Sequence, residues 1–423
     1  MNITAAAFVF THAGRDHFFR PVADVSFALD GLWAGGNPAG WHILGLLLHL
    51  SNTLLVLLLA WRLARCVEPG LLAAALFGIH GSCPESVAFL ARFDQLAALS
   101  VLAGLLLFDR YLQSEDGARG ALWASYPVVL AGLLSKESAY IFPVLALLLL
   151  AFRRQLTRRR LAATAGYFAL AALAFAWRWS VVGGIGGYRD RATGAPEIFI
   201  IHPVLLLKAL TLRLWGVLYF PINWSDQPRP WLAAATLAFL GALLCMILAG
   251  RPCRRALGFA AAFAFLASLP VAHMLLIGAD LRGAAHIYLP SAGFCLFLAF
   301  AADGISHTVG RRDAAGALIL FQFAALCHNL PIWSRTAQLA DRSCRMLARE
   351  AALSGRTLLV RDPPRILDGI PFFAVGLSEC VAMHASGSSV SVEFSPDSAG
   401  PADFVWDPRT RAFLRARVDA GMR

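Results

Sequence analysis

Long apolar runs fill most of the chain, and short polar segments separate them. A helix needs about 20 apolar residues to cross a hydrocarbon core of about 30 Å. The pattern therefore predicts an all-α polytopic membrane protein with about ten transmembrane helices. We expect the spans at residues 41–63, 70–90, 95–112, 120–136, 138–152, 161–182, 231–250, 256–277, 286–305 and 314–333.

The segments beside the spans have a mixed pattern. Residues 16–36 combine Phe, Trp, Arg and Asp, which is typical of a helix lying in the membrane interface. Residues 183–230 form the longest loop, and its apolar part, 202–220, predicts a second interfacial helix, with an extra span as the alternative. We divide the chain into an outer-face segment (1–40), a multi-span membrane domain (41–333) and a soluble tail (334–423).

The tail has a different pattern, because its apolar residues come in short alternating segments. An amphipathic helix is predicted over 336–352. Short strands are predicted at 357–360, 372–375, 389–394 and 404–406, with a hairpin turn over 407–410. We therefore expect a small α+β soluble tail.

Composition supports the membrane assignment. Of 423 residues, 58% are hydrophobic and only 15% are charged, which excludes a water-soluble globular domain of this length. The net charge of +11 comes almost wholly from arginine, since Lys136 and Lys208 are the only lysines. In a soluble protein such a charge would suggest nucleic acid. Here the basic residues lie in short loops between apolar runs, which indicates a lipid bilayer and no nucleic acid.

Arginines gather in every second loop, and basic loops of membrane proteins face the cytoplasm. The arginines in question are Arg62, Arg65, Arg110, Arg119, Arg153, Arg154, Arg158, Arg159, Arg160, Arg251, Arg254, Arg255, Arg311 and Arg312. The remaining loops should face the periplasm or lumen, and ten spans would place both termini of the chain there too. The eight cysteines form no CxxC pair and no metal-ligand spacing, so we interpret them as packed thiols.

Ionisable residues at membrane depth are costly, which makes them functional candidates. In this chain they gather near the predicted outer ends of the spans. They are His42 and His49, seven residues apart on one helix face, His80 with Glu85, Arg92 with Asp94, Lys136 with Glu137, and Arg20 with Asp24. Together they predict a polar pocket in which arginine and lysine bind phosphate and a carboxylate acts as a base.

The same residues also have structural interpretations. The two histidines would be hydrogen-bond partners between packed helices, and Lys136-Glu137 would be a solvated turn. Arg92 and Asp94 would form a structural ion pair. Arg20 and Asp24, four residues apart, would form a pair on the helix surface. Their convergence on one membrane face favours the functional interpretation.

At these residues the chain resembles bacterial GT-C glycosyltransferases and the transmembrane-tetratricopeptide O-mannosyltransferases. The similarity runs in order from about residue 18 to residue 345. Its motifs are Phe18-Phe19-Arg20-Pro21, Asn37-Pro38, Trp41-His42, Leu48-His49, Ala75 to His80, Glu85-Ser86-Val87-Ala88, Arg92-Phe93-Asp94, Ser135-Lys136-Glu137, Tyr288-Leu289-Pro290-Ser291, and Trp333 with Asp341.

The resemblance implies a sugar transferred from a polyprenyl-phosphate carrier to a protein or glycan acceptor on the periplasmic face of the inner membrane. It implies Glu85, Asp94 and Asp24 as the candidate catalytic acids. The substrate-binding candidates that follow are Arg20, His42, His49, His80, Arg92, Lys136, Glu137, Arg282 and Tyr288. The resemblance establishes no cofactor and leaves a divalent metal open, because a carboxylate positions a metal in some members of the family; we assign no metal ligands in this sequence.

The chain departs from the family pattern in three places. The family has a further span and an acidic motif before the segment that matches Phe18, and Asp16 or Asp24 would have to substitute for that acid. Ala284 and Ala285 replace a usual Glu and Arg, and Arg282 lies one helical turn before them. No tetratricopeptide repeats follow the last span.

Other functions remain open on the sequence. The departures favour a catalytically degenerate GT-C-like scaffold whose tail binds a partner. A glycan ligase or polymerase would suit the large 183–230 loop. A transporter or lipid flippase is disfavoured, because the polar residues gather at one face rather than at the midplane between two repeats. We expect an enzyme, a polyprenyl-phosphate-sugar-dependent hexosyltransferase.

Overall fold

The structure is a computed structural model. It describes residues 8–12, 18–35, 37–88, 92–114, 119–187, 202–225, 234, 237–239, 241–242, 244–245, 248, 250, 253–275, 277–278, 280–373, 376–385, 392–395 and 402–416. The predicted span at 231–250 lies largely outside these residues, as does Asp16. The chain divides into two compact units, Met1–Cys327 and His328–Arg423, and each is described by itself.

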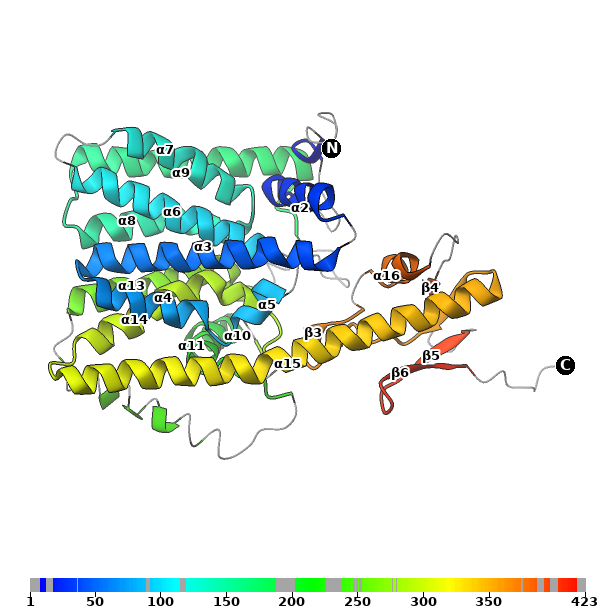
Figure 1. Cartoon of the computed structure of the whole chain (residues 1–423). Helices are drawn as coiled ribbons and strands as arrows, with labels where there is room; N and C mark the ends of the chain where they lie inside the picture. Colours follow the sequence, from blue (N-terminus) through cyan, green and yellow to red (C-terminus); the bar gives the residue numbers. More distant parts are fainter. Residues whose placement is uncertain are drawn as a thin grey trace. The chain divides into compact units, whose positions relative to one another are not determined.

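The first unit is a helical bundle (Figure 1). Its described elements are α2 (Pro21–Trp33), α3 (Pro38–Ala64), α4 (Val67–Gly78), α5 (Cys83–Ala88), α6 (Phe93–Gln113), α7 (Arg119–Leu133), η2 (Glu137–Ile141), α8 (Phe142–Phe152), α9 (Arg158–Val182), α10 (Pro203–Lys208), η4 (Ala209–Arg213), α11 (Leu214–Tyr219), α13 (Arg254–Ser268), η5 (Leu269–Met274), η6 (Ala284–Ile287), α14 (Tyr288–Asp303) and the first part of α15 (Thr308–Ser354).

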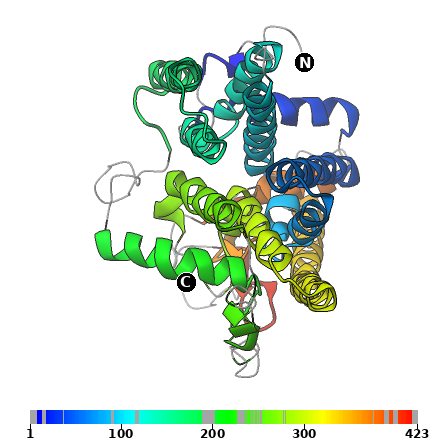
Figure 2. The same ribbon diagram turned by 90° about the vertical axis from the view of Figure 1, so that its left-hand side faces the viewer.

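Helices α3, α4, α6, α7, α13 and α14 make the most extensive contacts of the bundle, and α6 packs against α7. α3 packs between α4 and α6, and α14 packs against α4 and α13; Figure 2 shows this unit almost end-on. Two glycines allow helices to approach closely. A Cβ on Gly293 would lie 2.5 Å from the backbone nitrogen of Ala264, and one on Gly132 would lie 2.7 Å from the Ser100 Cβ.

Within the described residues, six helices are long and apolar enough to cross a membrane. They are Pro38–Ala64, Phe93–Gln113, Arg158–Val182, Arg254–Met274, Ala284–Asp303 and Thr308–Ser354. They confirm the predicted spans at 41–63, 95–112, 161–182, 256–277, 286–305 and 314–333. The predicted spans at 120–136 and 138–152 are helical but shorter, with the 3₁₀ turn η2 between them. The total of ten spans stays a prediction.

The continuous span predicted at 70–90 is wrong. The first helix, α4, ends at Gly78, and a separate short helix, α5, begins at Cys83. His80 stabilises the break, since its ring bonds the Ser82 hydroxyl at 2.8 Å and the Leu218 carbonyl at 3.2 Å. Gly81 is required there, because a Cβ would lie 2.5 Å from the Pro221 carbonyl oxygen. The run of apolar residues does not reveal this break, because hydrogen bonds to residues far away in the chain stabilise it.

The arginine-bearing segments lie at one end of the bundle. Asp109 near the end of α6 pairs with Arg62 of α3 at 3.3 Å and with Arg153 after α8 at 2.7 Å. Arg311 near the start of α15 bridges Glu68 of α4 and Asp303 of α14. These ion pairs connect segments that the sequence analysis assigned to one side of the membrane.

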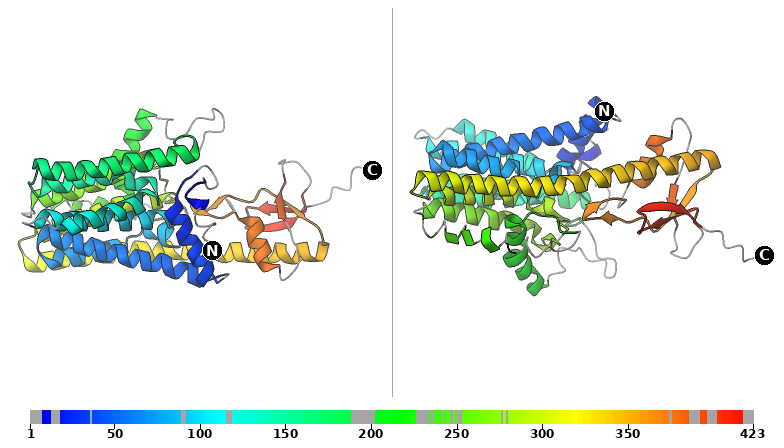
Figure 3. Two further views of the ribbon diagram at one scale, coloured as in Figure 1. Left: turned by 90° about the horizontal axis from the view of Figure 1, so that it is seen from above. Right: turned by 60° about the horizontal axis from the view of Figure 1, so that its bottom comes forward.

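The second unit combines the C-terminal part of α15 with a small sheet, shown in Figure 3. Its strands are β1 (Leu358–Arg361), β2 (Ile366–Leu367), β3 (Ile370–Pro371), β4 (Val392–Phe394), β5 (Phe404–Asp407) and β6 (Ala412–Arg415), with α16 (Leu377–His384) between β3 and β4. The main sheet has the order β4-β1-β5-β6; β1 runs parallel to β4 and β5, and β6 is antiparallel to β5.

This unit confirms the predicted α+β tail. Strands form at three of the four predicted positions, and Asp407 starts the predicted hairpin turn by bonding Thr410. The strand predicted at 372–375 is wrong at Phe372 and Phe373, which are buried in the core after β3 has ended; residues 374 and 375 lie outside the described residues. Packed thiols are also wrong for two of the cysteines, since Cys344 of α15 and Cys380 of α16 form a disulfide.

Candidate functional site

A buried lysine–aspartate pair lies at the end of the bundle where α6 begins. The Lys136 ammonium, in the turn before η2, lies 2.6 Å from both carboxylate oxygens of Asp94. Both side chains are almost fully buried. The Lys136 nitrogen also lies 3.3 Å from Nδ1 of His286 on η6. Three segments far apart in sequence therefore meet at one ammonium group.

Glu137, the neighbour of Lys136, binds two arginines. Its carboxylate lies 2.5 Å from Arg20 and 2.5 Å from Arg178 at the end of α9. Arg178 also donates a hydrogen bond to the Ile185 carbonyl at 3.0 Å. The solvated-turn interpretation of Lys136-Glu137 is therefore wrong, and so is the Arg20–Asp24 surface pair, because Arg20 pairs with Glu137.

Arg92 is the largest fully buried side chain among the described residues, with 1% exposure. It forms an ion pair with the buried Asp30 of α2 and donates a hydrogen bond to the Trp41 carbonyl at 3.0 Å. The predicted Arg92–Asp94 pair is therefore wrong. Arg92 precedes α6 and binds α2 and the start of α3, whereas Asp94 binds Lys136.

Glu85 is held by backbone groups. Its carboxylate accepts hydrogen bonds from the Gly283 N–H at 3.1 Å and the Ala285 N–H at 2.7 Å. Gly283 has φ +84°, a left-handed conformation that favours glycine. Burial raises the pKa of Glu85 to about 7, although the two N–H groups and Lys136 oppose this shift. Glu85 is therefore an acid that exchanges its proton near neutral pH.

Three other candidates pack into the helix interfaces. His49 bonds the Tyr288 hydroxyl at 2.8 Å and the Gly78 carbonyl at 3.1 Å, and Asn52 donates to the same hydroxyl at 3.4 Å. His80 stabilises the α4–α5 break. These contacts give His49, His80 and Tyr288 clear packing roles beside the charged residues.

The structure leaves three candidates outside these contacts. His42 and Arg282 are exposed, and within the described residues neither side chain makes a hydrogen bond or ion pair. His42 therefore differs from His49, although seven residues separate them on one helix. Asp24 is partly buried, and burial raises the pKa of its carboxyl while the charge of Arg20 opposes this shift.

Sequence reasoning missed Asp30, Arg178 and His286. Arg178 could have been found from the sequence, because it is an arginine inside an apolar run and charged residues are costly within a membrane. Asp30 lies in the predicted interfacial helix 16–36 and His286 at the first position of the span predicted at 286–305, and nothing local to either residue indicates its partner. Their partners come from segments far away in the chain.

The described residues do not fit a divalent metal. Among them, no group of three or more His, Cys, Asp or Glu side chains could hold an ion. Lys136 already occupies both oxygens of Asp94.

These observations define a multi-pass helical membrane protein with buried charged groups at both ends of the bundle, and the candidate site residues gather at the end where α6 begins. The chain is similar to several known proteins. The chain is 24% identical to the mouse protein O-mannosyl-transferase TMTC4, over 71% of this chain and 49% of that protein, and the human protein of the same name matches equally. It is 34% identical to the fruit-fly protein O-mannosyl-transferase Tmtc1, over 30% of this chain and 15% of that protein.

These relatives confirm the resemblance to the transmembrane-tetratricopeptide O-mannosyltransferases. The chain spans about half the length of the TMTC4 proteins that it matches. No protein-family model and no solved structure matches it.

Proposed function

We propose that this protein is a glycosyltransferase that moves a sugar from a polyprenyl-phosphate carrier to a hydroxyl group of a protein or glycan. Two observations support this. The relatives are named protein O-mannosyl-transferases. Glu85, Asp94 and Lys136, which lie in the motifs that carry the resemblance to that family, come together in one charged cluster.

The proposed location is the periplasmic face of the bacterial inner membrane. The cluster lies at the end of the bundle opposite the arginine-bearing segments, and the positive-inside rule assigns those segments to the cytoplasm. The Cys344–Cys380 disulfide supports an outer location for the second unit, because disulfides persist in oxidising compartments.

Glu85 carries the mechanistic proposal. Its pKa of about 7 suits a general base at neutral pH. In the proposed step, Glu85 takes the proton of the acceptor hydroxyl while that oxygen bonds to the anomeric carbon. The bond between this carbon and the carrier phosphate breaks, and the polyprenyl phosphate leaves with the electron pair. Inversion at the anomeric carbon is the outcome that the resemblance implies.

Other charged groups have supporting roles in this proposal. Lys136 and Arg20 attract the phosphate, and Asp94 positions Lys136 because both of its oxygens bind that ammonium. Ser86 Oγ and Arg92 Nε are buried and lack a hydrogen-bond partner among the described residues. Such atoms are rare in proteins and suit a place where substrate completes the hydrogen bonds.

The test uses the full chain in nanodiscs with a polyprenyl-phosphate-linked radiolabelled mannose and a serine- and threonine-containing acceptor peptide. We expect transfer by the wild type and a loss of about 10²–10⁴-fold in Glu85→Gln. Glu68→Gln is the matched control, since Glu68 lies at the start of α4, at the arginine-rich end. A Glu85→Gln variant with the wild-type rate would show that Glu85 is not the base.

A catalytically degenerate scaffold is the second candidate. Ala284 and Ala285 favour it, because they stand where the related pattern has Glu and Arg. A wild-type chain that binds the lipid-linked sugar but transfers none, with any donor sugar offered, would favour the scaffold over the enzyme.

A further inference from the structure

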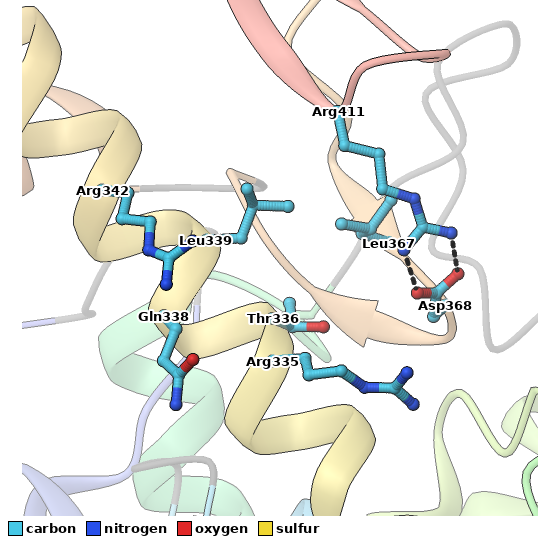
Figure 4. A pocket seen from close by; sticks show the side chains of 8 residues that line it. All are labelled: Arg335, Thr336, Gln338, Leu339, Arg342, Leu367, Asp368 and Arg411. Atoms are coloured by element: carbon cyan, nitrogen blue, oxygen red, sulfur yellow. Dashed lines mark hydrogen bonds and ion pairs between the residues drawn. The ribbon is translucent and has the colours of Figure 1, made fainter.

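The second unit contains a pocket of about 240 Å³, drawn in Figure 4. One wall is a face of α15, and the others are the tips of two hairpins. Its lining residues are Arg335, Thr336, Gln338, Leu339, Arg342, Leu367, Asp368 and Arg411. All belong to the second unit, so the pocket is independent of the charged cluster in the bundle.

The pocket lining is net positive, since three arginines face one aspartate. Arg411 donates two hydrogen bonds to Asp368, at 2.7 and 3.2 Å, and this pair joins the two hairpin tips. Asp368 and Gly369 both have positive φ and form the two-residue turn between β2 and β3. The hairpin geometry therefore holds Asp368, the one carboxylate among the described lining residues, against Arg411.

The other two arginines remain available to a ligand. Arg335 and Arg342 are seven residues apart, two helical turns, and both are exposed. Arg335 donates one hydrogen bond, to the Pro331 carbonyl at 3.3 Å, and pairs with no described carboxylate. Arg342 makes no hydrogen bond or ion pair to any residue that the structure describes. Gln338 and Thr336 add neutral donors between them.

This lining matches the chemistry of a phosphate group. Guanidinium groups bind phosphate oxygens through paired, charge-assisted hydrogen bonds, and amide and hydroxyl groups add further donors. The volume of the pocket indicates the size of the ligand, because pockets that bind drug-sized ligands have volumes of roughly 300–1,000 Å³. A pocket of about 240 Å³ lies just below this range, which suits a phosphate with a small ester group.

We propose that this pocket binds a phosphate monoester or diester group through Arg335 and Arg342. A lipid headgroup and a small soluble phosphate ester share this chemistry. Leu330-Pro331-Ile332-Trp333, which precede Arg335 in the same helix, favour the lipid, because tryptophan and apolar residues are typical of the membrane boundary. The proposal does not depend on sugar transfer by the bundle.

The test measures the affinity of the full chain, purified in a neutral detergent, by isothermal titration calorimetry. The probes are inorganic phosphate, glycerol 3-phosphate and short-chain phosphatidylglycerol, with short-chain phosphatidylcholine as the zwitterionic control. The variants are Arg335→Gln, Arg342→Gln and, as the matched control, Arg349→Gln. Arg349 is exposed on the same helix, seven residues beyond Arg342, and does not line the pocket.

We expect Arg335→Gln and Arg342→Gln each to weaken binding about tenfold or more, and Arg349→Gln to leave it unchanged. Strong binding of glycerol 3-phosphate would identify a soluble ester as the source, and binding of phosphatidylglycerol alone would identify a lipid. The Cys344–Cys380 disulfide, measured by mass under non-reducing conditions, checks that the second unit has formed its native cross-link in each variant. The proposal is overturned if the wild type binds none of the anionic probes, or if Arg349→Gln loses as much affinity as Arg342→Gln.

Discussion

Helix α6 carries a buried acid near each of its ends, and the two acids have different surroundings. Asp109, near the C-terminal end, is fully buried and accepts hydrogen bonds from Arg62, Arg153 and Gln113. Asp94, in the first turn, binds Lys136, which in turn contacts His286. Both acids join neighbouring segments of the bundle.

The surroundings separate a structural acid from a candidate functional one. The Asp109 carboxylate accepts hydrogen bonds from α3, from α6 itself and from the segment after α8, and these contacts join the helices. Near Asp94 lies Glu85, an acid whose hydrogen bonds come from backbone N–H groups. Two buried polar atoms at this end, Ser86 Oγ and Arg92 Nε, have no partner among the described residues. Burial and ion pairing are common to both ends, so they do not indicate function. A buried polar atom without a described partner occurs at the Asp109 end too, on Gln155. The Asp94 end differs in having Glu85, an acid whose pKa burial raises to about 7.

The largest expected effect comes from breaking one ion pair at each end. Lys136→Met leaves the Asp94 carboxylate buried without its cation, and Asp109→Asn leaves two arginines without their anion. Each should lower the free energy of unfolding by roughly 3–5 kcal/mol, measured by reversible unfolding in mixed micelles. Transfer per folded molecule should be lost only in Lys136→Met.

A double variant sharpens this test. Asp94→Asn with Lys136→Met removes both partners, which should restore much of the stability because no unpaired charge stays buried. Transfer should remain lost. Equal loss of transfer per folded molecule in Asp109→Asn would contradict the functional difference between the two ends.

An intermediate effect is expected from pH. Because burial raises the pKa of Glu85 to about 7, the carboxyl is mostly protonated below that pH and cannot accept a proton. Transfer should fall about tenfold for each pH unit below 7 and level off above it. A profile measured in nanodiscs from pH 5 to 9 checks this, and the residual activity of Glu85→Gln should lack the same inflection. A wild-type profile that stays flat down to pH 5 would count against Glu85 as the base.

The smallest expected effect comes from two matched arginines. Arg178 binds Glu137 and the Ile185 carbonyl, and Arg153 binds Asp109 and the Arg62 carbonyl. Arginine to lysine at either position keeps the charge but loses one hydrogen bond, which is worth about 0.5–1.5 kcal/mol. Stability should fall similarly in both variants. Transfer should fall by less than about tenfold in Arg178→Lys and stay unchanged in Arg153→Lys, as initial rates would show.

Local pattern was enough to predict much of the fold. The six long helices follow from runs of apolar residues, and the β5–β6 turn follows from Asp407, whose side chain bonds backbone two and three residues on. The break after Gly78 could not be predicted in this way, because His80 and Gly81 bond or contact residues more than a hundred positions away. The Cys344–Cys380 disulfide likewise depends on α16 packing on α15.

The candidate site shows the same division. Sequence reasoning found Glu85, Asp94 and Lys136 but paired Arg92 with Asp94 and Arg20 with Asp24, since those residues are close in the chain. The structure pairs Arg92 with Asp30 and Arg20 with Glu137. Proximity in sequence is a poor guide to ion pairs at helix ends, where the chain direction changes within one or two residues.

The attachment of Glu85 has a consequence for how the protein can vary. The contacts that hold its carboxylate come from the main chain at positions 283 and 285, and every residue other than proline supplies the same N–H at position 285. Alanine at 284 and 285 therefore leaves this contact intact. Side chains in that segment are free to diverge between relatives while the acid keeps its place, provided that position 283 keeps a residue that tolerates a left-handed backbone.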